Sequence, residues 1–393
     1  MRIGLFSDTY TPEVNGVVNS VLMLKEGLEE RGHDVFVIGP GNPDAAPEPN
    51  VFRAPAISLP VLQERRLASP WSAKLWRKVR KLDLDIVHTH TEFGVGGFGF
   101  RARRQLGLPQ VHTYHTVWEE YTHYVTQGRY FDARARRVVA NQTRRTLKHV
   151  DHVIVPSTKT LELLESYGVR NPISVIPTGV DLSRFSPPKA SDEKRLDALR
   201  TRYGVDRFST VLLMLGRIAE EKRVIGLLDM TAPHLRTHPD TCLLVVGDGP
   251  SLGELIARAT TLGIASQVLC TGEVPWESVP DFYRISDVHI GNSDTETQGL
   301  TFIEALASGT LVVSRYNSCF DGIFIDDFNA SLFDTDAHYL PELEEALDPT
   351  VRDARIEAGL LTAQQFNKTA FAEHVENVYL SLLDSGTPSE HHT

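Results

Sequence analysis

The chain alternates short apolar, β-branched runs with stretches of helical periodicity, and it does so twice. The predicted strands of the first half are 3–6, 35–38, 85–89, 111–114, 152–156 and 173–177. Those of the second half are 210–215, 242–246, 267–270, 288–290 and 311–314. Strands that are apolar along their whole length and are joined by helices form parallel sheets covered on both faces. The alternation therefore predicts an α/β protein with two doubly wound, Rossmann-like domains.

Domain boundaries follow from where this alternation pauses. Between the two sets of strands the chain reads SPPKASDEK, with two prolines among polar and charged residues, which is typical of a linker. We predict a first domain over residues 1–185, a linker over 186–203, a second domain over 204–366, a C-terminal helix over 367–384 and a disordered tail over 385–393. The pattern leaves open which domain the C-terminal helix packs on. Ligands of open α/β sheets bind beyond the carboxyl ends of the strands, so we expect a central cleft between two facing domains.

Composition and charge narrow the setting in which the protein works. No stretch approaches the ~20 apolar residues of a membrane span, and the first residues lack the basic start and long apolar run of a signal peptide. Three widely spaced cysteines favour free thiols in a reducing cytoplasm over disulfides or a zinc site. Residues 1–180 hold 23 Lys and Arg against 18 Asp and Glu, a net charge of +5, and the other residues hold 17 against 33, a net charge of −16. We expect the basic half to meet an anionic partner and the acidic half to hold any anion through specific local groups.

A cationic motif, GRIAEEK, follows the first predicted strand of the second domain. Arg217 and Lys222 then lie at a strand end beside a helix N-terminus, where free N–H groups and the helix dipole favour anions. A guanidinium binds phosphate oxygens in pairs, and an ammonium adds a point charge. The motif therefore predicts a diphosphate site. The alternative is a solvated surface pair, since Lys and Arg are usually exposed.

A pair of glutamates, in ETQGLTFIE, follows the predicted strand 288–290. Glu296 falls in a loop, and Glu304 falls on the second turn of a helix that is predicted to begin near Leu300 and to end at Gly309. The residues around Glu304 are apolar, so a carboxylate there needs a partner, and ribose hydroxyls would serve. The alternative is that Glu304 faces solvent and Glu296 caps the helix.

With these two motifs the chain resembles the retaining glycosyltransferases of the GT-B fold, in particular glycosyltransferase family 4, over nearly its whole length. The resemblance implies an enzyme that transfers a sugar from a nucleotide sugar. It implies that Arg217 and Lys222 hold the donor diphosphate, that Glu304 binds the ribose hydroxyls and that Glu296 contacts the transferred sugar. The other donor-binding positions that it implies are Thr297, Gln298, Gly299 and Leu300, through their backbone N–H groups, and Gly16, with its neighbours Asn15 and Val17, in the loop after the first strand.

Histidines follow two strands of the first domain. His115 ends the run VHTYHT, and the resemblance implies that it lies in the catalytic pocket and touches the donor sugar. A lone histidine after a strand is otherwise a structural residue. His88 and His90 have the spacing of metal ligands, but no carboxylate cluster completes a site, and we interpret them as lining near the acceptor. We expect no metal and no cofactor besides the UDP-sugar substrate, because two cations replace the metal.

Aromatic and basic residues gather in RRLASPWSAKLWRKVRKL, over residues 65–82. Apolar residues recur there every four positions beside seven Lys and Arg, a pattern that predicts a helix lying on an anionic membrane surface. The alternative is an ordinary surface helix whose tryptophans pack inward. Nothing resembles a nucleic-acid-binding module, so we expect no nucleic acid. The residues assigned to the acceptor and the membrane are Trp71, Lys74, Trp76, Arg77 and Lys78, with Trp118 and Tyr121 from the segment 112–125.

Within the family, the segments 85–94 and 112–125 look most like the bacterial diacylglycerol glycosyltransferases. This implies transfer of a hexose, with glucose as the first expectation, from a UDP-sugar to diacylglycerol with retention, on the inner face of the cell membrane. In the reaction usually assigned to the family, the leaving diphosphate helps to take the acceptor proton. Three alternatives keep the donor motifs: a soluble or phosphoinositol-type acceptor, a sugar-nucleotide epimerase, and a non-catalytic nucleotide-sugar binder. The sequence carries no prediction of the oligomeric state.

Overall fold

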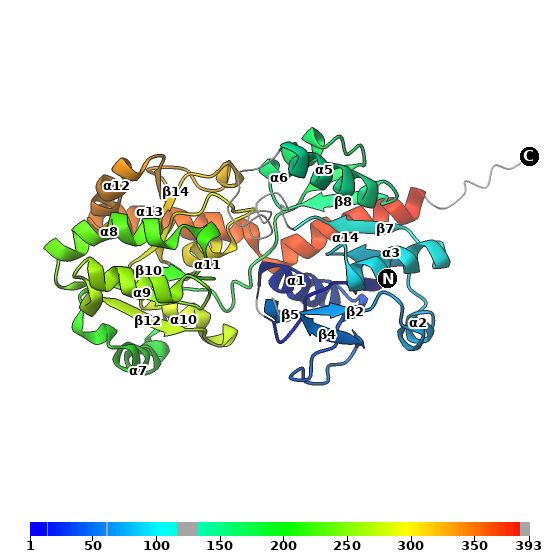
Figure 1. The fold of residues 1–393 in the computed structure, drawn as a ribbon, viewed down its shortest axis with the longest axis horizontal. Helices are drawn as coiled ribbons and strands as arrows, with labels where there is room; N and C mark the ends of the chain where they lie inside the picture. Colours follow the sequence, from blue (N-terminus) through cyan, green and yellow to red (C-terminus); the bar gives the residue numbers. More distant parts are fainter. Residues whose placement is uncertain (14, 60–61, 116–132, 386–393) are drawn as a thin grey trace, which may run out of the picture. The chain divides into compact units, whose positions relative to one another are not determined.

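The computed structural model describes residues 1–13, 15–59, 62–115 and 133–385. It divides into two compact units, the first formed by Met1–Gly179 with Lys368–Thr393 and the second by Val180–Asn367. Each unit is built on one parallel sheet with helices on both faces (Figure 1). The predicted α/β class with two Rossmann-like domains is therefore confirmed.

The first unit contains a seven-stranded sheet in the order β3-β2-β1-β6-β7-β8-β9, and a separate antiparallel pair, β4-β5. The strands are β1 (Arg2–Phe6), β2 (Asp34–Pro40), β3 (Val51–Ala54), β4 (Ala56–Leu59), β5 (Leu62–Ala68), β6 (Ile86–Thr89), β7 (Gln110–Thr113), β8 (His152–Val155) and β9 (Ile173–Val175). The helices are α1 (Gly16–Glu30), α2 (Ala73–Val79), α3 (Gly94–Leu106), α5 (Ala133–Leu147), α6 (Thr158–Ser166) and α14 (Lys368–Ser385).

The C-terminal helix α14 packs along α1, which settles the point that the sequence left open. Gly27 of α1 allows this close approach, because a Cβ there would lie 2.6 Å from the Cβ of Ala372. At the start of α14 the Lys368 ammonium is paired with Glu26 and Glu30 of α1. The helix therefore belongs to the first unit, although the chain reaches it only after completing the second.

The second unit contains a six-stranded parallel sheet in the order β12-β11-β10-β13-β14-β15. The strands are β10 (Thr210–Leu215), β11 (Thr241–Val246), β12 (Val268–Gly272), β13 (Val288–Gly291), β14 (Leu311–Arg315) and β15 (Ser331–Phe333). The helices are α7 (Glu193–Tyr203), α8 (Val224–Thr237), α9 (Leu252–Thr261), α10 (Val279–Arg284), α11 (Leu300–Ser308), α12 (Tyr339–Ala346) and α13 (Pro349–Ala363).

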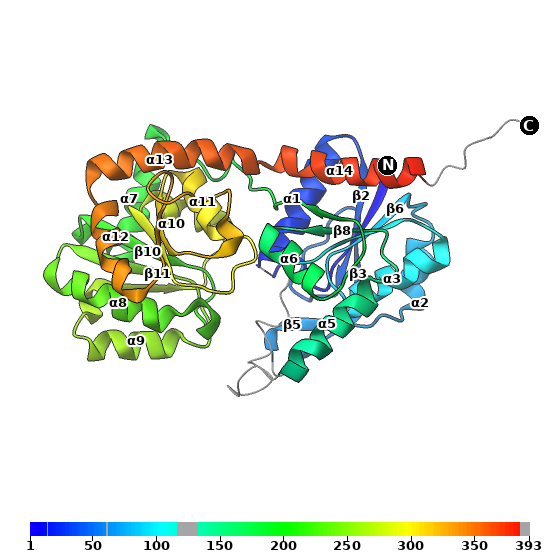
Figure 2. The ribbon, with the colours of Figure 1, turned by 90° about the horizontal axis from the view of Figure 1, so that it is seen from above.

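Alternate residues of β10 serve two separate cores. Leu212 and Met214 belong to the core under α8, α9 and α12, whereas Val211 and Leu213 belong to the core under α10 and α11. Figure 2 shows α8 and α9 on one side of β10 and β11, with α10 and α11 on the other. A strand buried on both faces is apolar along its buried part, which is why β10 reads VLLML after its first residue, Thr210.

In both units the strand order reverses at one place, because successive strands are added first to one side of a central strand and then to the other. In the first unit the reversal lies between β1 and β6, and in the second between β10 and β13. The loops that leave the carboxyl ends of two such strands diverge, and ligands of open α/β sheets bind there. Each unit thus has one preferred place for a site, which we call its switch point.

Two predictions about elements are wrong. The predicted linker 186–203 contains α7 and belongs to the second unit, where the Arg195 guanidinium is paired with Asp281 of α10. The basic segment 65–82 is not one helix: it begins in β5, which pairs with β4, and only α2 is helical. Polar composition identified a surface segment in the first case, and fourfold apolar spacing was mistaken for helical periodicity in the second.

Some predictions fall outside the described residues or concern the membrane. Trp118 and Tyr121 lie in the segment 116–132, and the predicted tail lies almost wholly in 386–393, both outside the described parts. Among the helices that the structure describes, none is long and apolar enough to cross a membrane.

Candidate functional site

Two loops meet at the switch point of the second unit. The GRIAEEK loop leaves β10, and the loop Asn292–Gly299 leaves the neighbouring strand β13. The hydroxyls of Ser293 and Thr295 donate to the backbone carbonyl of Glu221, at 3.4 and 3.2 Å. The two predicted motifs, about 75 residues apart in the chain, are therefore bonded to each other.

The cation and the first glutamate of these motifs form an ion pair. Lys222 Nζ lies 2.6 Å from Glu296 Oε1, and beside it Arg223 Nη1 lies 2.7 Å from Asp294 Oδ2. Lys222 ends a short 3₁₀ turn, and Arg223, with φ of 50°, then turns the chain into α8. An ammonium has three N–H donors, so Lys222 can keep Glu296 and still donate to another anion.

The second predicted cation, Arg217, lies at the mouth of the same loop. Its side chain is exposed, and Nη1 is 3.7 Å from Oε1 of the buried Glu221. The guanidinium therefore lies close to a buried carboxylate, while 44% of the side-chain surface is exposed to solvent. Arg217 and Lys222 thus lie on the same short loop after β10.

The GRIAEEK loop packs closely on the run GDGP, over 247–250, because this run contains two glycines. A Cβ at Gly247 would lie 1.9 Å from the Gly216 carbonyl oxygen, and one at Gly249 would lie 2.3 Å from that of Ile218. The Ile218 N–H donates to the Asp248 carbonyl at 2.9 Å. The two glycines are explained by support of the cationic loop.

The second glutamate, Glu304, is buried on α11, with 6% of its surface exposed. The alternative that it faces solvent is therefore wrong. Its Oε2 accepts a hydrogen bond of 3.0 Å from the hydroxyl of Tyr283 on α10. Burial raises the pKa of the Glu304 carboxyl to about 7, and the bond from Tyr283 acts in the opposite direction. A carboxylate that gives up this much solvation is typical of a functional site.

At the start of α11, a glycine lets the backbone lie close to aromatic rings. Gly299 precedes Leu300 with φ of 75° and, as a glycine, offers no side chain to cap this helix end. A Cβ at Gly299 would lie 2.8 Å from the ring of Phe320. The first turn of α11 therefore presents backbone N–H groups, which favour an anion or a polar hydroxyl. Glu296, Thr297 and Gln298 lie in the loop just before this turn.

Several groups that support the site were not predicted from the sequence. Tyr283 belongs to them, and so does Asn292, whose Oδ1 accepts from Arg315 Nε at 2.7 Å. His289 of β13 lies edge-on to Tyr283, and its Nδ1 is 3.1 Å from the Leu213 carbonyl. Burial lowers the pKa of His289 to about 4. The signal in the sequence was weak, because each is an ordinary residue in a strand, a short helix or a loop start.

The switch point of the first unit is lined by histidines. His90 Nδ1 lies 3.0 Å from His115 Nε2, and the ring of His88 stacks on that of His90 at 4.2 Å between centroids. His88 also bonds to the hydroxyls of Tyr379 and Thr113, at 2.6 and 2.7 Å. The structure thus brings His115 together with both histidines of the run VHTH.

Burial keeps these histidines neutral. It lowers the pKa of His115 to about 3, with a further contribution from His112, and it lowers the pKa of His88 and His90 well below the ordinary value. Neutral imidazoles carry one donor and one acceptor each, so the cluster offers hydrogen bonds without charge.

The loop that contains Gly16 opens α1. Asn15 caps this helix: its Oδ1 accepts from the N–H groups of Val17 and Val18, at 3.1 and 3.0 Å. Asn15 Nδ2 donates in turn to Thr9 Oγ1 at 2.8 Å. The predicted loop after the first strand therefore ends at Asn15, and Gly16 is the first residue of the helix.

The predicted membrane residues divide into two groups. Trp71 is 73% exposed, with the Arg101 guanidinium 4.4 Å from its ring, and Lys74, Arg77 and Lys78 are exposed on α2. Trp76 instead packs edge-on against Phe98, at 6.1 Å between centroids. For Trp76 the alternative of an inward-packed side chain is therefore correct.

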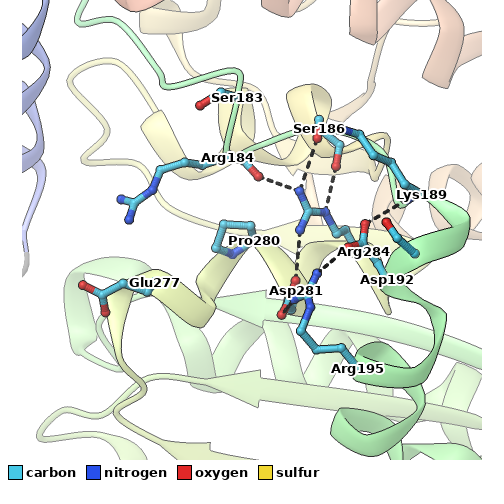
Figure 3. Close-up of a pocket in the computed structure, with 11 residues that line it drawn as sticks. Ser183, Arg184, Ser186, Lys189, Asp192, Arg195, Glu277, Pro280, Asp281 and Arg284 are labelled. Carbon is cyan, nitrogen blue, oxygen red and sulfur yellow. Dashed lines mark hydrogen bonds and ion pairs between the residues drawn. The ribbon is translucent and has the colours of Figure 1, made fainter.

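A polar cavity of about 350 Å³ lies elsewhere in the second unit, and it contains none of the donor-motif residues. Figure 3 shows Arg284 at its centre, bonded to Ser186, to the Arg184 carbonyl and to Asp281. Asp281 is paired with both Arg195 and Arg284, which indicates a structural role in tying 183–195 to α10. The lining residues are Ser183, Arg184, Ser186, Lys189, Ser191, Asp192, Arg195, Glu277, Pro280, Asp281 and Arg284.

Comparison with known families matches both units. Residues 14–184 match the model of Glycosyltransferase Family 4, and residues 197–356 match that of Glycosyl transferases group 1.

Individual proteins extend these matches over the whole chain. The chain is 34% identical to alpha-monoglucosyldiacylglycerol synthase of Streptococcus pneumoniae, over 98% of this chain and 87% of that one. It is 31% identical to the synthase of the same name from Acholeplasma laidlawii, over 98% of each chain. Among solved structures, that of Anabaena HepE in complex with UDP and glucose has a TM-score of 0.74 at 19% identity, covering 97% of this chain and 100% of that one. This structural likeness assigns the GT-B fold.

Proposed function

The chain belongs to glycosyltransferase family 4, and on this basis we propose that it transfers glucose from UDP-glucose to diacylglycerol with retention of configuration. The observation that carries the proposal is the identity, over nearly all of the chain, to two proteins named for the synthesis of monoglucosyldiacylglycerol. The product is a glycolipid. The family membership establishes that the protein is a glycosyltransferase. The proposal concerns the donor, the acceptor and the stereochemistry of the transfer.

The donor side of the proposal uses the switch point of the second unit. Arg217 and Lys222 hold the diphosphate of the UDP-sugar, and Glu304 accepts hydrogen bonds from the ribose hydroxyls. Glu296 and the N–H groups of Thr297, Gln298, Gly299 and Leu300 hold the hexose. The hydrogen bonds from Ser293 and Thr295 to the Glu221 carbonyl support this assignment, because they hold the two loops together. Lys222 Nζ and Glu296 Oε1 then lie 2.6 Å apart.

The reaction that we propose breaks the bond between the anomeric carbon and the diphosphate oxygen. The acceptor hydroxyl forms the new bond on the same face, and its proton goes to the leaving diphosphate, which departs as UDP. Negative charge grows on the diphosphate as the bond breaks, and preorganised cations lower the energy of that state. Arg217 and Lys222 supply these charges, so the proposed reaction involves no metal ion.

On the first unit we propose that His115 contacts the donor sugar and that Gly16 lies beside the diphosphate. The neutral imidazole supports the first role, because it can hydrogen-bond to a sugar hydroxyl without attracting the diphosphate away from Lys222. The position of Gly16 at the start of α1 supports the second, because the N–H groups of a first helical turn favour phosphate.

We further propose that α2 and Trp71 place the protein on the anionic inner face of the cell membrane, where diacylglycerol is found. The exposed side chains of Lys74, Arg77 and Lys78 support an electrostatic contact, and exposed Trp71 supports insertion at the headgroup level. Trp118 and Tyr121 remain assigned to the acceptor by resemblance.

The test is a matrix of labelled nucleotide sugars and acceptors. Wild-type protein is incubated with UDP-glucose, UDP-galactose, UDP-N-acetylglucosamine and GDP-mannose, each with diacylglycerol vesicles, with inositol phosphate or with no acceptor. We expect labelled lipid from UDP-glucose with diacylglycerol, and we expect Glu304→Ala to abolish it. Product on inositol phosphate alone would replace the acceptor, product without acceptor would indicate an epimerase, and binding without product would indicate a non-catalytic binder.

A further inference from the structure

A tyrosine outside the predicted motifs contacts the buried glutamate of the second unit. The hydroxyl of Tyr283 lies 3.0 Å from Glu304 Oε2. Tyr283 is fully buried, at 0% exposed, and Glu304 is 6% exposed. Among the described residues, this is the side-chain hydrogen bond that the Glu304 carboxylate accepts. It uses one of the roughly four acceptor positions of a carboxylate and leaves the others for a ligand.

The direction of this hydrogen bond is fixed by burial. Burial, together with the charge of Glu304, raises the pKa of Tyr283 well above its ordinary value, so its hydroxyl keeps its proton and donates. Burial also raises the pKa of Glu304 to about 7, and the bond from Tyr283 opposes that rise. Tyr283 therefore favours the ionised carboxylate, which is the form that can accept from two hydroxyls at once.

Charged groups on the elements around Glu304 are engaged elsewhere. On α13, Arg355 bonds to Ser331, Asp327 and Glu345. On β14, Arg315 bonds to Asn292 and Asp336. On β13, His289 is neutral, since burial lowers its pKa to about 4. Within the described residues, the group that acts on the Glu304 carboxylate is thus Tyr283.

The short helix that carries Tyr283 is held from both sides. Thr310 Oγ1 donates to the Tyr283 carbonyl at 2.8 Å. The next residue, Arg284, donates to the carbonyls of Ser186 and Arg184, at 2.8 and 2.6 Å, within the cavity of Figure 3. A six-residue helix has little stability of its own, so these bonds fix where the tyrosine hydroxyl lies. The cavity residues therefore hold α10 in place through Arg284, while the neighbouring Tyr283 bonds to Glu304.

We propose that Tyr283 is a positioning residue for the nucleotide, which holds Glu304 in the orientation that accepts the ribose hydroxyls. The inference rests on the proposed donor role of Glu304. Tyr283 itself does not touch the ligand. Its removal leaves Glu304 in place but free to rotate and easier to protonate, so nucleotide affinity falls while the chemical step is spared.

The test compares two fully buried tyrosines of the second unit whose hydroxyls have different hydrogen-bond partners. Tyr339 is also fully buried in the second unit, and its hydroxyl lies 2.8 Å from Thr231 Oγ1. Tyr283→Phe and Tyr339→Phe each remove one buried, hydrogen-bonded hydroxyl. UDP binding is measured by calorimetry on wild type and both variants at pH 6.5, 7.5 and 9, and kcat is measured at saturating UDP-sugar.

We expect Tyr283→Phe to weaken UDP binding by about tenfold at pH 7.5, the size of a lost hydrogen bond to a charged group. The loss is larger at pH 6.5 and smaller at pH 9, because the pKa of Glu304 rises without its donor. We expect kcat to stay within about twofold of wild type, and Tyr339→Phe to bind UDP as wild type does. Equal UDP affinity in the two Phe variants overturns the inference, as does a loss that is the same at every pH.

A double-mutant cycle covers the case in which Tyr283→Phe folds poorly. Glu304→Gln keeps the shape of the side chain and removes the buried charge. If Tyr283 acts through the carboxylate, adding Tyr283→Phe to Glu304→Gln weakens UDP binding no further, and a full additional loss contradicts the inference. A wild-type protein that binds neither UDP nor GDP overturns the proposed function, and with it this inference. Wild-type binding with an unaffected Tyr283→Phe overturns the inference alone.

Discussion

The two units use the same topology and opposite electrostatics. Each has a parallel sheet whose order reverses once, between β1 and β6 or between β10 and β13. At the first reversal, β6 and the loops after β6 and β7 bring together three neutral histidines, His88, His90 and His115. His90 bonds to His115, and His88 bonds to hydroxyls. At the second they bring together paired charges, with Lys222 against Glu296. The sheet therefore decides where a site lies, and the few residues after each strand decide what it binds.

The difference suits a division of labour. A charged donor such as a nucleoside diphosphate sugar needs cations, and these lie in the unit whose net charge is negative, so they must act locally. A neutral acceptor and a sugar need hydrogen bonds without charge, which neutral imidazoles provide. Exposed basic residues of the first half lie on α2, as Lys74 and Arg77, and on α5, as Arg144 and Arg145.

The largest expected effect tests the charged side of the comparison. Lys222→Ala removes a cation that we assign to the leaving diphosphate, and we expect kcat to fall on the order of 10²–10³-fold. Lys222→Arg keeps the charge and should recover part of the rate. Lys194→Ala, an exposed lysine on α7 of the same unit, is the matched control and should be silent. If kcat of Lys222→Ala stays within a few-fold of wild type, the Lys222 cation does not stabilise the leaving diphosphate, and that part of the proposed reaction is wrong.

The second prediction concerns the stability cost of the buried glutamate. Its pKa rises from 4.5 to about 7 on folding, so its contribution to stability is full below pH 4.5 and is lost as the pH rises through 7. Glu304→Gln should therefore unfold like wild type near pH 4.5 and should be more stable above pH 7, by about 3 kcal/mol at most. Thermal melting across this range measures it. Glu344→Gln, exposed on α12, should show no such pH-dependent gain.

The third prediction compares how the local stability of the two units changes on acidification. A histidine with a lowered pKa stabilises the fold above about pH 6.5 and loses that contribution as the pH falls. Between pH 7.5 and 5.5, amide exchange in β6 and β7 should speed up by on the order of tenfold, after correction for intrinsic rates. The α11 region around Glu304 should be unchanged or more protected. Equal acceleration in both units would contradict the contrast between them.

The smallest effect is expected at the membrane surface. Trp71→Ser with Lys74→Ser should weaken binding to vesicles rich in anionic lipid by about fivefold, close to the loss of one basic side chain near the surface. Binding by wild type should fall as salt is raised. The matched control is Leu361→Ser with Lys194→Ser, which changes an exposed apolar and an exposed basic residue of the second unit. If neither double variant changes the affinity for vesicles, α2 and Trp71 do not bind the membrane.

The sequence predicted the long features of the fold well. Strand β10 is apolar at every position after Thr210. Helix α11 begins and ends within one residue of its predicted bounds because glycines flank it. The strands β3 and β15, of four and three residues, were missed, although β6 and β9, which have the same lengths, were predicted. The 186–203 segment was mistaken for a linker because its anchoring, through Arg195 and Arg284, involves partners far along the chain.

The site divides in the same way. Arg217, Lys222, Glu296 and Glu304 could be predicted because they sit in two compact motifs, each directly after a strand. Tyr283 could not, because its importance comes from a hydrogen bond to a residue 21 positions away and from the burial of both groups. Contacts between side chains on different helices leave no periodic signal in a single sequence.

The most direct test of the account is the product itself. The protein is incubated with UDP-glucose and diacylglycerol in anionic vesicles, the lipid fraction is isolated, and the anomeric configuration of any glucosyl lipid is determined by NMR. The account predicts α-glucosyl diacylglycerol, the configuration of the donor, from wild type and from Lys194→Ala but not from Glu304→Ala. A β-linked product, or no glucosyl lipid from an enzyme that binds UDP, would contradict it.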